Sequence, residues 1–116
     1  MKNAAETAWP VAMANLAQAI GEANQDLVDK GIEAQFRNEP LAGSSADRGM
    51  EIVLQHNGET ATASITLGSN GNADVVFKHS ARREHKDLQI AAGTIDAWAD
   101  VLHQLYEIAL PPKTYI

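Results

Sequence analysis

Residues 50–67 read Met-Glu-Ile-Val-Leu-Gln-His-Asn-Gly-Glu-Thr-Ala-Thr-Ala-Ser-Ile-Thr-Leu, and this stretch decides the fold. Asn57-Gly58 in its middle is the dipeptide most typical of a two-residue turn between antiparallel strands. With that turn, the apolar residues of the two halves fall opposite one another on one face, and mostly polar residues fall on the other. The stretch therefore predicts a β-hairpin with one buried face. The expected pairs are Leu54 with Ala61, Ile52 with Ala63 and Met50 with Ile65.

Alternation of apolar and polar residues predicts three further strands, over 32–37, 73–79 and 87–91. The first of them is followed by 38–49, which is dense in turn-forming residues and is expected to be a loop. A three-residue turn at Asn70-Gly71-Asn72 pairs Leu67 with Val75 and keeps the apolar residues on one face.

Two amphipathic helices flank the strands. The first is expected over 7–30, with Thr7 as N-cap, Pro10 in the first turn and Gly31 as the stop. Thr94 is expected to cap the second helix. The apolar stripes are Trp9, Met13, Leu16, Ile20 and Leu27, and Ile95, Trp98, Leu102, Leu105 and Ala109. We therefore predict one α+β domain over 1–116: an N-terminal helix, a four- or five-stranded antiparallel meander sheet and a C-terminal helix, with both helices packed on one sheet face.

Composition excludes several classes of protein. The 116 residues include no cysteine, so disulfides and thiolate chemistry are absent. No apolar run approaches the roughly 20 residues that cross a bilayer, so no membrane span is expected. The net charge of −6 argues against non-specific nucleic-acid binding, which depends on cations that neutralise phosphates. Polar residues interrupt the alanine-rich N-terminal stretch, which therefore does not form a secretory signal, and a cytoplasmic protein is predicted.

Two groups of residues resemble metal or catalytic sites, and a simpler interpretation accounts for each. His56 and His79 share the inward parity of their strands, but the expected register separates them by ~13 Å, too far for two ligands of one ion. A carboxylate and imidazole face on the second helix has the spacing of a solvated surface. It consists of Asp96, Asp100, His103 and Glu107. No metal, cofactor or catalytic residue is predicted from either group.

One basic cluster is the best candidate for a site. It consists of Lys78, His79, Arg82, Arg83, His85 and Lys86. Residues 73–93 carry a net charge of +1, whereas the chain on either side is acidic. A local positive edge on an acidic protein can bind a phosphate, a nucleotide or an acidic partner. The alternative is a solubilising connection between strands, whose charges discourage pairing between sheet edges. Arg82 and Arg83 are expected to lie between strands, and the cluster is the candidate for binding a ligand or a partner.

The serines of the loop at 38–49 lack the flanking pattern of a phosphate-binding loop or of a nucleophilic serine. With no catalytic constellation, the sequence favours a non-enzymatic protein-interaction domain that binds a protein partner or itself as a homodimer. The alternative is a domain that binds a small anionic ligand through the basic edge 78–86, beside a cleft between sheet and helices.

Overall fold

A computed structural model describes residues 4–41, 43, 49–56, 58–68 and 70–109, apart from the side chains of 4–6. Helix α1 (Ala4–Asp29) precedes five strands, β1 (Ala34–Pro40), β2 (Gly49–His56), β3 (Glu59–Leu67), β4 (Asn72–His79) and β5 (Arg82–Gln89). A 3₁₀ turn, η1 (Ile90–Ala92), leads to helix α2 (Ile95–Ala109). The strands form one antiparallel sheet in the order β1-β2-β3-β4-β5, a meander without crossovers.

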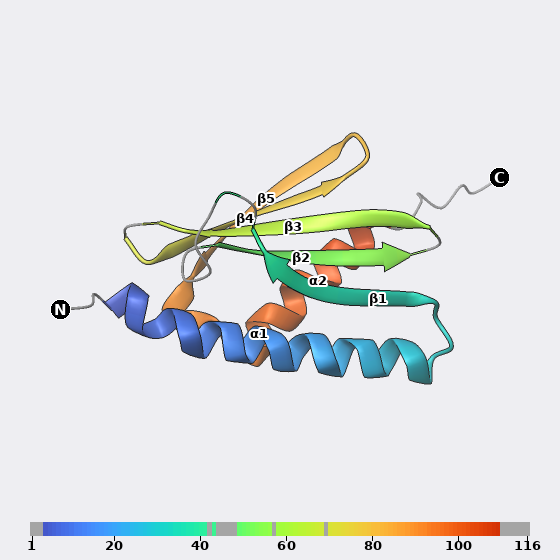
Figure 1. Ribbon diagram of the computed structural model, residues 1–116, viewed down its shortest axis with the longest axis horizontal. Coiled ribbons are helices and arrows are strands. Elements are labelled where there is room, and N and C mark those ends of the chain that lie inside the picture. Colours follow the sequence, from blue (N-terminus) through green and yellow to red (C-terminus); the bar gives the residue numbers. More distant parts are fainter. Residues whose placement is uncertain (1–3, 42, 44–48, 57, 69, 110–116) are drawn as a thin grey trace.

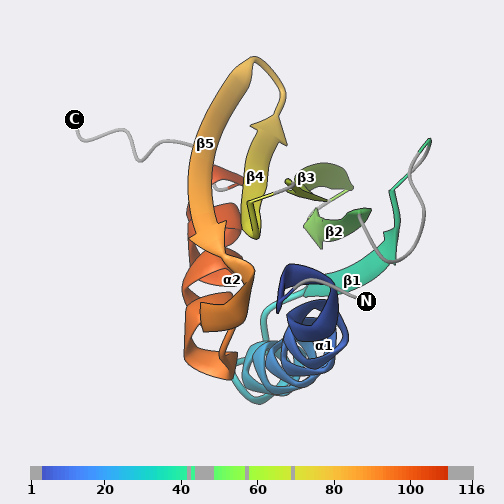
Figure 2. The ribbon, with the colours of Figure 1, turned by 90° about the vertical axis from the view of Figure 1, so that its left-hand side faces the viewer.

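Both helices pack on the same face of the sheet, as Figure 2 shows, and this confirms the predicted architecture. In Figure 1 α1 runs along β1, and α2 lies behind the sheet. The buried faces of the strands meet the apolar stripes of the two helices in a single core. Its largest fully buried side chains include Trp98, Phe77, Leu16 and Ile65. No described helix is long and apolar enough to cross a membrane.

The central hairpin has the predicted register. Leu54 faces Ala61, Ile52 faces Ala63 and Met50 faces Ile65, and the loop between β2 and β3 is the expected Asn57-Gly58. Gly58 has a φ of 79°, which the turn requires and which glycine adopts without steric cost. Asn57 itself lies outside the described residues.

The loop between β3 and β4 is shifted from its predicted position. Leu67 faces Ala73 and not Val75, because Gly68 N–H donates to the carbonyl of Asn72 at 2.8 Å and closes the loop one residue earlier on each side. The loop keeps an odd number of residues, so the apolar side chains stay on one face in both registers. The odd loop length determines which sheet face the side chains occupy, and the hydrogen bond at Gly68 determines which residues of β3 and β4 pair.

The first helix begins earlier than predicted. Thr7 is inside α1 and not its N-cap, and Pro10 lies in the second turn and not the first. Alanine is the strongest helix former, and Ala4 and Ala5 extend the helix toward the N-terminus. The helix stops at Gly31 as predicted, with a φ of 69° and a hydrogen bond from Ile32 N–H to the carbonyl of Leu27.

The N-cap of α2 is the predicted Thr94, whose Oγ1 accepts a hydrogen bond from Ala97 N–H at 3.2 Å. Gly93 before it packs closely, because a Cβ at this position would lie 3.0 Å from the Ala12 Cβ on α1. The carbonyl of Gly93 accepts a hydrogen bond from Asn15 Nδ2 at 2.9 Å. These contacts fix the start of α2 against α1.

The first strand extends beyond its predicted end. The sequence places Asn38 in a loop, but Asn38 faces Ile52 and the strand continues to Pro40, which faces Met50. A proline is tolerated here because β1 is an edge strand and the missing N–H costs no ladder hydrogen bond.

Asn24 on α1 binds the backbone of β1 at both polar groups of one residue. Its Nδ2 donates to the carbonyl of Phe36 at 3.0 Å, and its Oδ1 accepts from Phe36 N–H at 2.8 Å. Ala34 N–H donates to the carbonyl of Ile32. At Phe36, the Asn24 side chain therefore forms the two hydrogen bonds that a neighbouring strand would otherwise form.

Candidate functional site

The basic cluster lies on a hairpin that the sequence analysis did not predict. Strand β5 begins at Arg82 and not at Asp87, and it ends at Gln89. His79 faces Arg82 across a two-residue turn, Ser80-Ala81, in which Ser80 has a φ of 55°. The prediction that Arg82 and Arg83 lie in a connection between strands is therefore wrong. The turn contains no glycine or asparagine, and the strand has no alternation of apolar residues, so both usual signals are missing.

The six predicted residues are divided between the two faces of the sheet. Ala73, Val75 and Phe77 of β4 are buried toward the helices, so the opposite parity of each strand points to the outer face, away from the helices. The outer face carries Lys78, Arg83 and His85, and the helix side carries His79, Arg82 and Lys86. The structure therefore does not gather the basic cluster into one patch.

Several of these cations are paired with carboxylates. His79 Nε2 lies 3.2 Å from Glu59 Oε2, and Arg82 donates to Glu84 Oε2 at 3.0 Å. Lys78 and Arg83 face each other across β4 and β5 on the outer face, and no carboxylate within the described residues pairs with either of them. On the outer face, these two residues are the part of the predicted site without a carboxylate partner; Lys86, on the helix side, has none among the described residues either.

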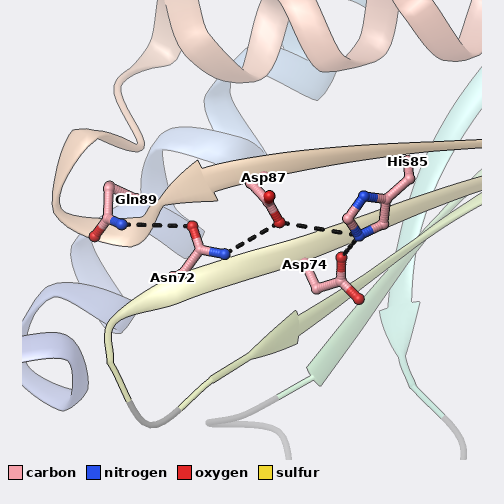
Figure 3. A network of polar contacts seen from close by, with 5 residues as sticks. All are labelled: Asn72, Asp74, His85, Asp87 and Gln89. Carbon is pink, nitrogen blue, oxygen red and sulfur yellow. Dashed lines mark hydrogen bonds and ion pairs between the residues drawn. The ribbon is translucent and has the colours of Figure 1, made fainter.

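Beside them on the outer face lies a polar network that joins β4 to β5 (Figure 3). His85 Nε2 forms an ion pair with Asp74 Oδ1 and lies 3.9 Å from Asp87 Oδ1. Asn72 Nδ2 donates to the same Asp87 oxygen at 3.1 Å, and Gln89 Nε2 donates to Asn72 Oδ1 at 3.5 Å. The network spans three alternate rows of the ladder, those whose side chains lie on the outer face, and fixes β5 against β4.

Three of these side chains have the chemistry of cation ligands. The ligand atoms of Asp74, His85 and Asp87 lie within 4.8 Å of one another. Carboxylate and imidazole groups bind divalent metals, but in this network they already form ion pairs and hydrogen bonds with one another. This cluster was not predicted from the sequence, because Asp74 faces Asp87 in a register that the turn between His79 and Arg82 sets.

The two histidines that we considered as a pair lie at one end of the sheet. His56 faces Glu59, whose carboxylate contacts His79, so the shifted register brings the two histidine rows closer than the predicted ~13 Å. The His56 ring meets Tyr106 of α2 edge-on, with 6.0 Å between ring centroids. The described residues include no metal-ligand cluster that contains either histidine.

The polar face of α2 is exposed along its length. Asp96, Asp100, His103 and Glu107 are all exposed. His103 Nε2 lies 2.7 Å from Glu107 Oε1, an ion pair one turn along the helix. The arrangement fits the predicted solvated surface.

A groove of about 410 Å³ lies between the C-terminal half of α1, α2 and the start of β1. Its walls are mainly apolar and include Leu27, Ile32, Phe36 and Leu102. His103 borders the groove, but Asp100 does not. None of the predicted basic residues lines it, so the groove and the basic hairpin are separate features of the surface.

No family model, curated protein or solved structure gave a significant match to this chain.

Proposed function

We propose that this chain is a non-enzymatic protein-interaction domain that acts as a homodimer. The observation that supports the proposal is the strand β5, which pairs with β4 alone among the described strands and forms one end of the sheet (Figure 2). An unpaired strand presents a row of backbone donors and acceptors to another chain. An interaction through a sheet edge requires neither a cofactor nor a catalytic group.

The small core supports the same proposal. Leu, Ile, Val and Phe together account for only 25 of 116 residues, a fraction just above the roughly 20% at which chains stop folding independently. Both helices lie on one face of the sheet, which leaves the other face without a helix. Association would bury further surface and so stabilise a domain whose own hydrophobic core is small.

Sedimentation equilibrium of the purified chain over about 1–200 μM tests this function. We expect a single monomer–dimer equilibrium with a mass that approaches twice 12.5 kDa at the upper end of the range. A strict monomer at every concentration would contradict the homodimer.

A second candidate function is the binding of a small anion at Lys78 and Arg83. The observation that favours it is their cross-strand position on the outer face, where neither cation has a carboxylate partner among the described residues. Two adjacent cations attract phosphate through charge-assisted hydrogen bonds.

Thermal unfolding with inorganic phosphate or ATP tests the anion site, because a ligand that binds only the folded state raises its melting temperature. We expect an increase for the wild-type chain and none for the Lys78→Gln, Arg83→Gln double variant. Arg37→Gln, on the same face of the distant strand β1, is the control and should respond like the wild type. Equal shifts in all three proteins would contradict binding at this pair.

A further inference from the structure

The free edge of β5 offers a defined set of backbone groups. His79 and Arg82 flank a two-residue turn, and such a pair exchanges both of its backbone hydrogen bonds. Hydrogen-bonded and non-bonded pairs then alternate along an antiparallel ladder. The N–H and C=O groups of Arg83, His85, Asp87 and Gln89 therefore point away from β4 toward the edge. No described side chain or loop binds these groups.

The charges along this edge are complementary to those of a second copy of the same strand that runs antiparallel to it. Residues 83–87 read Arg-Glu-His-Lys-Asp, so a positive and a negative residue precede His85 and a positive and a negative residue follow it. When a second copy runs antiparallel with His85 opposite His85, Arg83 faces Asp87 of the second copy and Glu84 faces Lys86 of the second copy. The two-fold symmetry repeats each pair, and opposite charges directly across two strands stabilise a ladder.

Other registers lack this complementarity. A shift of one strand by a single residue places edge-facing residues opposite residues whose backbone groups already bond to β4. Such a register cannot form the backbone ladder. Among the registers that can form it, centring on Glu84 sets Glu84 against its own copy and Arg82 against Lys86. Centring on Lys86 sets Lys86 against its own copy. Like charges directly opposite are destabilising, so these neighbouring registers are disfavoured.

Three of the four side chains in these pairs are available, whereas Glu84 already accepts hydrogen bonds from Arg82 at 3.0 Å and from Gln104 at 3.2 Å. Arg83 and Lys86 have no ion-pair partner among the described residues. Asp87 uses only its Oδ1 for Asn72 and His85, which leaves Oδ2 to accept from a second chain. Pairing about His85 also keeps outer-face residues on the outer face, so the helices of both copies lie on the same side of one continuous sheet.

We infer that two copies of this chain pair antiparallel through β5 in the register centred on His85. The inference rests on the homodimer proposed above and specifies its surface. Charges on an edge strand usually prevent pairing with other chains. Here the same charges select one partner, a second copy, and one register.

A charge-exchange experiment tests the register. Arg83→Asp and Asp87→Arg each place like charges opposite one another at two positions of the interface, so each variant should dimerise at least about tenfold more weakly. An equimolar mixture of the two variants restores both attractions and should form a heterodimer. The double variant Arg83→Asp, Asp87→Arg should recover the homodimer.

Sedimentation equilibrium measures each species, and a melting curve confirms that each variant is folded. Arg37→Asp is the matched control, because it reverses the same charge on the same sheet face at the opposite edge strand, and it should dimerise like the wild type. Glu84→Lys and Lys86→Glu form a second exchange pair on the helix side, with the same expected loss and recovery.

Three results would overturn the inference, and they are distinguishable. A wild-type chain that stays monomeric contradicts the proposed homodimer itself. A dimer that withstands both single variants supports the homodimer but excludes this surface. Loss of the dimer in the single variants without recovery in the mixture or the double variant excludes the complementary register.

Discussion

The two edges of the sheet are finished in different ways. At β1, Asn24 binds both backbone groups of Phe36, Ala34 N–H bonds to Ile32, and Pro40 has no N–H to offer. At β5, the corresponding backbone groups have no such partner among the described residues. Proteins usually protect both edges against unwanted pairing. The difference indicates that side-chain hydrogen bonds and a proline protect much of the β1 edge, whereas charged side chains restrict pairing at β5.

The largest expected effect comes from removing the protection of the β1 edge with Asn24→Ala. This change removes the partners of Phe36 N–H and C=O in a partly buried position, which should cost about 1–3 kcal/mol of unfolding free energy. Urea unfolding measures the loss. Gln25→Ala is the control, because Gln25 is exposed and contacts only Asp29 on its own helix, so it should stay within about 0.5 kcal/mol. Equal losses of unfolding free energy in both variants would show that the Asn24 hydrogen bonds do not stabilise the β1 edge.

A smaller effect is expected at the turn that positions the β5 edge. Ser80 has a φ of 55°, where a side chain is unfavourable and glycine is not, so Ser80→Gly should stabilise the fold by up to about 1 kcal/mol. The neighbouring Ala81 has no positive φ, so Ala81→Gly should instead destabilise by up to about 1 kcal/mol. Thermal unfolding of the two variants checks the opposite signs. The same sign for both would contradict the turn geometry.

Pro40→Val should leave stability within about 0.5 kcal/mol but alter association. Pro40 lies on the edge side of β1, and valine would add a free N–H there. We expect higher-order species at high concentration in sedimentation velocity, because β1 would then add a second edge capable of pairing. An unchanged distribution would show that Asn24 alone is sufficient to close the edge.

The smallest effect concerns the end of the helix that carries Asn24. The hydrogen bond and ion pair from Lys30 to Asp26 raise the pKa of Lys30 above its ordinary value of 10.5. Because the raised pKa belongs to the folded state, its contribution to stability is complete below about pH 10.5 and is lost as the pH rises through the folded value. The melting temperature of the wild type should exceed that of Asp26→Asn at pH 8, and the difference should shrink as the pH rises above 10.5. A melting-temperature difference that stays constant as the pH rises would show that it does not arise from the Lys30–Asp26 ion pair.

The sequence specifies the central hairpin better than either edge of the sheet. Asn57-Gly58 and the alternation on both sides of it predicted the central register, and Gly31 and Thr94 predicted helix ends. These features are local, and their physical causes lie within a few residues. The Asn24 contacts were not predicted, because they depend on how α1 lies along β1.

The charged strand could not be predicted from its own residues. Arg82–Asp87 has neither apolar alternation nor high strand propensity, so its conformation depends on pairing with β4 and on the turn at Ser80. The candidate site changed with it, because a connection between strands would gather the cations whereas a strand divides them between two faces. Predicting β5 from Arg82 would also have shown the pairing of Asp74 with Asp87.

The position of Asn24 along the chain has a consequence for synthesis on the ribosome. Asn24 closes the β1 edge from only twelve residues before Phe36, so the closing group and the strand belong to one short N-terminal segment. Contacts over such short separations form early and at low entropic cost. The contacts that occupy the β1 edge can therefore form before β5, the last of the described strands in the chain, has been synthesised.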